Sequence, residues 1–309
     1  MNPTSQYSSH LFDRDARNNS WSNLLRFIPR GSRVLDVGCS SGNFGEALEQ
    51  MNECSVVGVD LNPDDIAVAR QKISEAHVLD ITDDTAPDIL GTFDVIVFAD
   101  VLEHLPDPRA ALVKIRSMLR DRGVVVYSIP NMSHASIRLD LLEGRFGYTE
   151  VGLLDKTHFH FYDGDEINDV FASAGYRIDA EEPVVSEYPE GMVRERLAKI
   201  GLAANAEFFD MLHRTESNIY QYVGVAEPDQ APPSEWRRPV RSTPPDDILT
   251  RAREIENECA LLRSERDLLR SERDAVRNEL DGLVAHIAFV KRHPLTFLFR
   301  KITGRPTHG

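Results

Sequence analysis

The sequence predicts an α/β protein built on a doubly wound sheet. Short apolar runs rich in β-branched residues alternate with helix-like stretches from Ser32 to about Ala226. One run leads into a glycine-rich turn, and acidic residues follow three successive runs. Strands that are buried on both faces of a parallel sheet read as continuous apolar runs. The alternation of strand-like and helix-like segments therefore favours the βαβ class.

The segments follow each other in a regular order. Helical segments with apolar residues at helical spacing lie between the runs. The strand candidates are 33–38, 55–60, 77–82, 93–98 and 123–129, and the helix candidates are 43–51, 64–73 and 109–120. Two further strands, near 176–186 and 218–226, flank a helical segment from about 191 to 215. Together they predict a Rossmann-like sheet of seven strands.

An irregular stretch from 130 to 162, here called the insertion, interrupts this order. It contains several histidines and aromatic residues, and a helix is expected to open near Asp163. Insertions of this length inside an α/β domain are usually functional. We therefore expect the insertion to serve the function of the domain.

The chain is expected to consist of four parts. A domain over 1–226 is followed by a linker over 227–245, which contains six prolines and so favours an extended spacer. A coiled coil is predicted over 246–290, because apolar residues recur every seven positions from Ile248 to Leu283. Arg266 and Arg273 occupy seam positions there, so a solvated single helix remains the alternative.

The last part, 291–309, differs in charge from the rest of the chain. It carries five basic and no acidic residues, and aromatic and aliphatic side chains lie among them. Such a segment suits an anionic membrane interface or a partner protein. The alternative is a short helix packed on the rest of the chain.

Composition excludes several classes of function. The chain has 309 residues and a formal net charge of −15, from 50 acidic and 35 basic residues, which argues against a nucleic-acid partner. Cys39, Cys54 and Cys259 fit neither a disulfide framework nor a zinc site. The first ten residues are polar and no run of 18 apolar residues occurs. We therefore expect a soluble, cytoplasmic protein.

The most specific motif is the segment from Val34 to Gly45, a strand followed by a glycine-rich turn and a helix. Gly38 and Gly42 let the backbone approach a ligand closely. A dinucleotide site would show G-x-G-x-x-G, but Ser40 replaces the second glycine. Asp36, just before the turn, suits the ammonium group of a methionine moiety better than a pyrophosphate.

Two further acids follow the next strands. Asp60 ends the second strand, where a carboxylate accepts hydrogen bonds from two ribose hydroxyls. Asp80 ends the third strand, where an adenine amino group is expected. Three such acids beside this turn predict a site for an adenosine that carries a methionine-like arm.

At this point residues 32–130 resemble a class I S-adenosylmethionine-dependent methyltransferase, and the resemblance extends from about Tyr7 to Ala226. The segments 128–132, 144–148 and 152–162 are similar to a bacterial subfamily found beside, or fused to, surface-glycan enzymes. His160, Phe161 and Tyr162 depart from the Arg-Phe-Phe that members often carry. The donor site implied by the resemblance comprises Asp36, Gly38, Cys39, Gly42, Asp60, Leu61, Asp80, Ile81 and Ala99.

A sugar hydroxyl has a high pKa, so its methylation gains from a general base, and a neutral histidine is the usual choice. The candidates are His104, His158 and His160, of which His104 and His158 are favoured because strand ends and the loops above them form the crevice of this fold. For each one, a merely structural histidine is the alternative. Asp155 and Arg138 are candidates for binding acceptor hydroxyls.

The segment from Asp100 to His104 is similar to the Glu-x-x-Glu-His element of ubiquinone-type O-methyltransferases, whose side chains can hold a divalent cation. Here the first acid is Asp100 rather than Glu. Catecholate-like acceptors gain most from a metal. We therefore do not expect a required metal.

The leading hypothesis is a methyltransferase that acts on a sugar hydroxyl of a bacterial surface glycan or its lipid-linked precursor. The alternatives are an O-methyltransferase of a quinone, lipid or small metabolite, and a scaffold without turnover. The coiled coil is expected to form a homo-oligomer. It would tether the enzyme to glycan-assembly proteins or, through the tail, to the inner face of the membrane.

Overall fold

The computed structural model describes residues 18–229 together with Arg273 and Arg277. The chain divides into two units, 1–248 and 249–309, and the fold below is that of the first. Of the predicted linker only 227–229 are described. The predicted coiled coil and tail lie outside the described residues, apart from the two arginines, which are helical.

A mixed sheet of eight strands forms the centre of the fold, in the order β3-β2-β1-β4-β5-β8-β6, with β7 also paired to β8. Strands β1 to β5 are parallel, and β8 runs antiparallel to β5 and to β6. The strands are β1 (Arg33–Val37), β2 (Ser55–Asp60), β3 (Glu75–Val78), β4 (Phe93–Ala99), β5 (Leu119–Pro130), β6 (Tyr176–Glu181), β7 (Val184–Val185) and β8 (Ile219–Pro228).

The α/β class is confirmed, but the expected number of seven strands is corrected to eight. The segment 176–186 forms two strands, β6 and the two-residue β7, instead of one. Pro183 lies between them and has no backbone N–H to donate to the sheet. β8 extends two residues beyond the expected end, and its Pro228 pairs with Tyr176.

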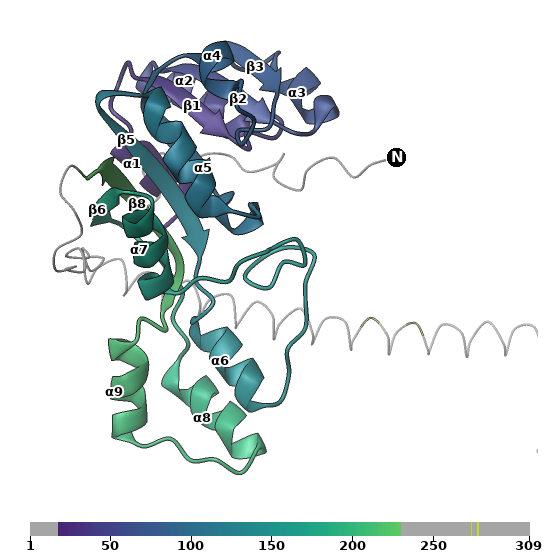
Figure 1. The fold of residues 1–309 in the computed structure, drawn as a ribbon. Helices are drawn as coiled ribbons and strands as arrows, with labels where there is room; N and C mark the ends of the chain where they lie inside the picture. Colours follow the sequence, from purple (N-terminus) through teal and green to yellow (C-terminus); the bar gives the residue numbers. More distant parts are fainter. Residues whose placement is uncertain (1–17, 230–272, 274–276, 278–309) are drawn as a thin grey trace, which may run out of the picture. The chain divides into compact units, whose positions relative to one another are not determined.

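Helices lie on the two faces of the sheet and beyond its edge (Figure 1). They are α1 (Ser20–Phe27), α2 (Asn43–Asn52), α3 (Pro63–Ala69), α4 (Ala86–Leu90), α5 (Pro108–Ile115), α6 (Ala135–Leu142), α7 (Gly164–Ser173), α8 (Glu190–Lys199) and α9 (Ala206–Arg214), with 3₁₀ turns η1 (Leu102–His104) and η2 (Arg116–Met118). The helix expected at Asp163 is α7, and the Asp163 side chain caps it. In the described part, no helix combines the length and apolarity needed to cross a bilayer.

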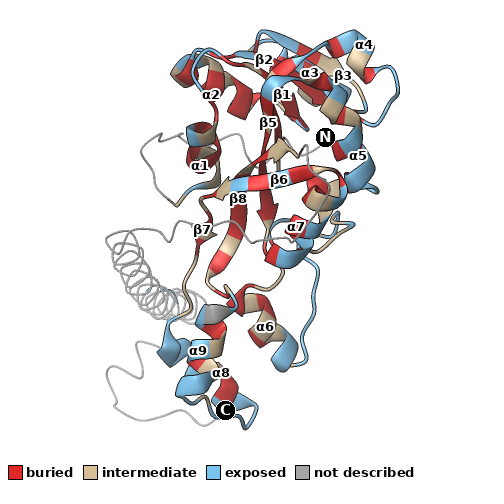
Figure 2. Cartoon of the chain, turned by 60° about the vertical axis from the view of Figure 1, so that its left-hand side comes forward, coloured by how far each residue is buried: buried red, intermediate tan, exposed pale blue. Residues whose placement is uncertain are grey.

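The core lies in the sheet, as the predominance of buried residues in the strands shows (Figure 2). Val34, Leu35 and Ile96, on the central strands β1 and β4, are fully buried. This explains the continuous apolar runs in the sequence, because both faces of these strands are covered.

The insertion contains one helix, α6, and then runs as a long irregular loop to α7 (Figure 1). Helices α6, α8 and α9 share a separate small core formed by Leu139, Val193, Leu197, Phe209 and Leu212. The loop is anchored to the main domain, because the backbone carbonyl of Glu103 accepts hydrogen bonds from the N–H groups of Phe159 and His160. The insertion is thereby held against the turn that follows β4.

Candidate active site

A pocket of about 470 Å³ opens where β1, β4 and β5 end. The strand order reverses between β1 and β4, and this is where ligands bind in open α/β sheets. Its volume is in the range of small-molecule sites. The lining residues are Ser20, Trp21, Asp36, Gly38, Cys39, Ser40, Ser41, Asn43, Phe44, Ala99, Asp100, Glu103, His104, Pro130, Val151, Gly152, Leu153, Asp155, His158, Tyr220 and Gln221.

The turn after β1 requires glycine at two positions. Gly38 and Gly42 have φ values of 70° and 76°, in the left-handed region. A Cβ on Gly38 would lie 2.7 Å from the side chain of Val101, and one on Gly42 would lie 3.0 Å from Cα of Ala69. The turn therefore keeps its backbone close to the pocket only with glycine at both places.

Asp36 is buried at the end of β1, and its Oδ2 has no hydrogen-bond partner. Burial, and then the negative charge of Asp60, raise the pKa of Asp36 to about 7. A buried carboxylate without a partner is costly, and a cation placed beside it removes that cost. The residue therefore fits the ammonium group of a methionine moiety.

The other predicted donor-site residues fall into two groups. Cys39 and Ala99 line the pocket with Asp36 and Gly38. Asp60, Leu61, Asp80 and Ile81 lie at the ends of β2 and β3 or just beyond them, outside the pocket lining.

The carboxylates of Asp60 and Asp80 already accept hydrogen bonds from nearby groups. Asp60 accepts from the backbone N–H groups of Ser40 (2.9 Å) and Asn62 (2.8 Å) and so fixes the glycine-rich turn. Asp80 is exposed, and its Oδ1 accepts from the backbone N–H and the hydroxyl of Thr82. Both carboxylates keep lone pairs available for further hydrogen bonds.

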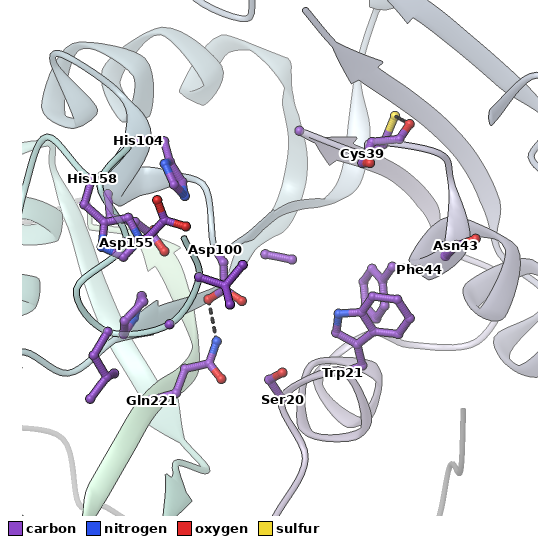
Figure 3. A pocket seen from close by; sticks show the side chains of 18 of the residues that line it. Ser20, Trp21, Cys39, Asn43, Phe44, Asp100, His104, Asp155, His158 and Gln221 are labelled. Atoms are coloured by element: carbon purple, nitrogen blue, oxygen red, sulfur yellow. Dashed lines mark hydrogen bonds between the residues drawn. The ribbon is translucent and has the colours of Figure 1, made fainter. Parts of the chain in front are cut away.

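Two of the three predicted histidines lie in the pocket. His104 ends η1, and His158 comes from the insertion; their ring centroids are 4.7 Å apart. Figure 3 shows both rings beside Asp155, with Trp21 and Phe44 on the opposite side and Asp100 between the two groups. His160 lies outside this pocket, in a smaller neighbouring cavity, where its Nε2 is 3.3 Å from the carbonyl of Pro106.

His158 is placed to act as a base. Burial, and then the charge of His104, lower the pKa of His158 below its usual value of 6.5. The imidazole is therefore neutral at pH 7 and able to accept a proton.

Two further acids line the pocket, the half-buried Asp100 and the buried Glu103. Oδ1 of Asp100 accepts hydrogen bonds from the Ser128 hydroxyl (3.0 Å) and the Gln221 amide (Figure 3). Both carboxylate oxygens of Glu103 lack a partner, and burial followed by the charge of Asp100 raises the pKa of Glu103. Glu103, His104 and His158 each offer one ligand atom within 4.8 Å of the others, a set that suits a base cluster or a divalent cation.

Of the two residues predicted to bind acceptor hydroxyls, Asp155 lies at the pocket and Arg138 lies away from it. Asp155 lines the pocket, and its Oδ1 accepts from the N–H and hydroxyl of Thr157. Arg138 lies outside the lining, and its guanidinium donates to Ser133 and Thr215. It joins the start of α6 to the end of α9 and is not directed at an acceptor.

Several lining residues were not among the residues predicted from the sequence. Tyr220 and Gln221 belong to β8, whose antiparallel direction brings its first residues to the edge where the parallel strands end. A prediction that the last strand runs antiparallel would have placed these two residues at the pocket. Ser20 and Trp21 come from α1, which was not predicted, and nothing in their sequence pattern indicates a ligand.

Comparisons with known proteins agree with this geometry. Residues 11–181 match the model of the family described as "Methyltransferase domain". The chain is 32% identical over 143 residues to a ubiquinone biosynthesis O-methyltransferase of Xanthomonas axonopodis pv. citri, a match that covers 45% of this chain and 58% of that protein. A protein of the same name from Cereibacter sphaeroides is 32% identical over 170 residues, with 53% and 65% covered. The match thus spans little more than half of these relatives.

Among solved structures, the chain is similar to a SAM-dependent methyltransferase from Archaeoglobus fulgidus, with 20% identity, a TM-score of 0.46 and coverage of 67% of this chain and 91% of that one. The family model covers more than half of the chain. The chain therefore belongs to the methyltransferase domain family, and its pocket holds the glycine-rich turn and the buried Asp36.

Proposed function

We propose that the protein methylates a phenolic hydroxyl of a small acceptor. The observation that carries this proposal is a single pocket that contains both the glycine-rich turn with Asp36 and the His104–His158 pair. The turn is the donor half of the pocket, and the insertion provides the acceptor half. A hydroxyl between the two halves is therefore held near the methyl group and near a base at the same time.

The donor supplies an electrophilic methyl group on a sulfonium. The acceptor oxygen forms a bond to the methyl carbon as the carbon–sulfur bond breaks, and the sulfur keeps the electron pair. His158, which its lowered pKa keeps neutral at pH 7, takes the proton of the hydroxyl. Asp36 holds the ammonium of the donor. Asp60, which lies outside the pocket lining at the end of β2, fixes the turn and keeps lone pairs for the ribose hydroxyls.

The relatives favour a phenol over a sugar. The curated proteins that match the chain are named for ubiquinone biosynthesis, and this supports the phenolic alternative better than the glycan hypothesis. A phenol also loses its proton more readily than a sugar hydroxyl, so a single histidine suffices as base. A glycan hydroxyl is the competing acceptor.

Turnover with a panel of acceptors tests the proposal. Purified protein is incubated with the methyl donor and either catechols and simple phenols or rhamnose- and mannose-type glycans, and formation of S-adenosylhomocysteine and the product mass are measured. We expect methylated phenols and no methylated glycan. Methylation of a glycan alone would overturn the phenolic assignment and support the sugar hydroxyl.

The proposal also includes a role for the segments beyond residue 229. The heptads over 246–290 favour self-association of the chain, and the basic, aromatic tail over 291–309 favours contact with a membrane surface or a protein of an assembly. Self-association would place several active sites together.

A further inference from the structure

Exposed apolar side chains are concentrated on the insertion. Six of the 14 exposed large apolar residues in the described part of the chain lie within residues 141–159. Phe146 is 48% exposed and Tyr148 is 60% exposed, yet their rings contact each other with centroids 5.5 Å apart. Exposed ring pairs of this kind mark sites of contact with an apolar partner.

This ring pair is continuous with the active site. Phe161 lies 6.4 Å from both Phe146 and Tyr148, and His158 lies 6.0 Å from Phe161, measured between ring centroids. A series of aromatic rings thus leads from the surface to the base in the pocket. Val151, which is both exposed and part of the pocket lining, lies in the same loop.

The loop that carries the rings is braced by hydrogen bonds. The N–H of Thr149 donates to the carbonyl of Leu154 (2.8 Å), and that of Lys156 donates to the carbonyl of Thr149 (3.1 Å). Phe161 packs against the small buried cluster of Ile137, Leu153 and Leu154. The backbone from Thr149 to Lys156 and the ring of Phe161 are therefore ordered before a ligand arrives, which reduces the entropy lost on binding.

The charges around the rings favour a neutral occupant. The only basic residues between 140 and 166 are Arg145 and Lys156. Arg145 pairs with Asp140 and Glu143, and Lys156 pairs with Glu150. The segment thus has no unpaired basic side chain for an anionic lipid headgroup, whereas an uncharged apolar group meets no electrostatic penalty there.

We propose that Phe146 and Tyr148 form a subsite for an apolar arm of the acceptor, on the far side of the acceptor from the hydroxyl that is methylated. This inference rests on the proposed function for the position of that hydroxyl. It narrows the acceptor class to phenols that carry an alkyl or similar uncharged chain. Phe161 lies between His158 and the subsite in this series of rings.

Alkyl gallates test the subsite, because the same phenol is available with arms of different length. We compare methyl and octyl gallate, below the micelle concentration of the latter, by calorimetric binding to protein saturated with S-adenosylhomocysteine and by turnover. The octyl ester is expected to bind at least tenfold more tightly than the methyl ester, because apolar area leaves water. In the double variant Phe146→Ser/Tyr148→Ser, this ratio should fall below about threefold.

Ile89→Ser is the matched control. Ile89 is 51% exposed on α4, which lies at the opposite end of the fold in Figure 1. It should keep the ratio of the native protein, and all three proteins should bind methyl gallate equally. Thermal unfolding midpoints within about 2 °C of the native value verify that the double variant is folded.

The outcomes separate the subsite from the proposed function. An equal affinity for both esters in the native protein, or an unchanged ratio in the double variant, overturns the subsite even if turnover occurs. Binding of the arm without methylation of either ester supports the subsite and counts against the phenolic function. A double variant that keeps the ratio but loses recovery with phosphatidylglycerol vesicles overturns the subsite and assigns the rings to a membrane.

Discussion

At the scale of single residues, we expect Asp36 to control the binding of the donor. Its pKa of about 7 in the free protein means that half of the molecules carry a neutral Asp36 near neutral pH. A cationic donor favours the ionised form, so binding releases a proton at lower pH. We expect affinity for S-adenosylmethionine to rise with pH through about 7 and then level off.

Calorimetric titration with S-adenosylmethionine between pH 5.5 and 8.5 measures this pH dependence of donor affinity. Asp36→Asn should bind the donor at least tenfold more weakly at pH 8, because a charge-assisted contact is lost. It should also show a flat profile through pH 7. A native profile that is itself flat would mean that Asp36 does not pair with the ammonium group.

The same carboxyl should make the unliganded protein less stable as pH rises. The pKa of Asp36 is raised from 3.8 to about 7 on folding, so the folded state binds the proton more tightly than the unfolded state. This stabilisation is complete below pH 3.8 and is lost as pH rises through 7, and it amounts to a few kcal/mol.

Asp100 and Glu103 also have raised pKa values, so only the difference between two proteins isolates Asp36. Urea unfolding of native protein and Asp36→Asn at pH 5 and pH 8, without ligand, gives that difference. The native protein should lose more free energy of unfolding between these values. An equal loss in both proteins would contradict the assignment.

His158 should control the chemical step. Replacing it with Gln removes the base and should lower kcat by about 100-fold, with donor affinity unchanged. Because burial and His104 lower the pKa of His158, the rising limb of the native pH profile should lie below pH 6.5. His160→Gln is the matched control, since that ring lies outside the pocket, and should keep most of kcat.

At the scale of secondary-structure elements, the turn between β1 and α2 allows a controlled comparison. Gly42 and Gly201 have nearly the same φ, 76° and 77°, but a Cβ on Gly201, which follows α8, meets nothing within 4 Å. Both Ala variants incur the cost of a positive φ, about 1–2 kcal/mol. Gly42→Ala should also lose donor affinity, because its Cβ would push α3 away at Ala69. Equal donor binding by both variants would contradict a close-packed turn.

The elements show why sequence predicts one part of the fold better than another. The runs ending at Val37, Asp60 and Ala99 are buried strands whose composition alone reveals them. The helix expected over 109–120 instead ends at Ile115, and β5 begins at Leu119, because pairing of Leu119 with Phe93 extends the sheet. That contact between distant residues has no local signal.

The candidate site divides in the same way. Asp36 and Gly38 lie in one short motif, and His104 lies in another. The spacing within each motif therefore predicts that these residues lie at strand ends. Whether His158 or His160 faces the pocket depends on how the insertion folds back on Glu103, and hydrogen bonds to that carbonyl decide it. Sequence therefore predicts which residues follow the strand ends, but not which parts of the insertion face the pocket.

At the scale of the whole molecule, the chemistry and the association of the chain are proposed for different segments. Among the described residues, those that line the pocket lie between Ser20 and Gln221. For the heptad segment and the tail we propose a role in association and location. Truncated chains can separate association and location from chemistry.

Deletion of 246–309 should leave affinity for S-adenosylhomocysteine within about twofold of the native value. The heptads from Ile248 to Leu283 predict that the native chain self-associates, and so the truncated chain should show a fall in solution mass much larger than the deleted residues explain. The five basic residues after 290 predict that recovery with anionic vesicles also falls.

Light scattering measures the solution mass, and vesicle sedimentation measures the recovery with anionic vesicles. Deletion of 291–309 alone shows which segment is responsible for each property. That shorter deletion should keep the oligomer and lose the vesicles, because it leaves the heptads intact. A mass that falls only by the deleted residues, with unchanged recovery, would leave a monomeric enzyme whose catalytic unit alone determines where it acts.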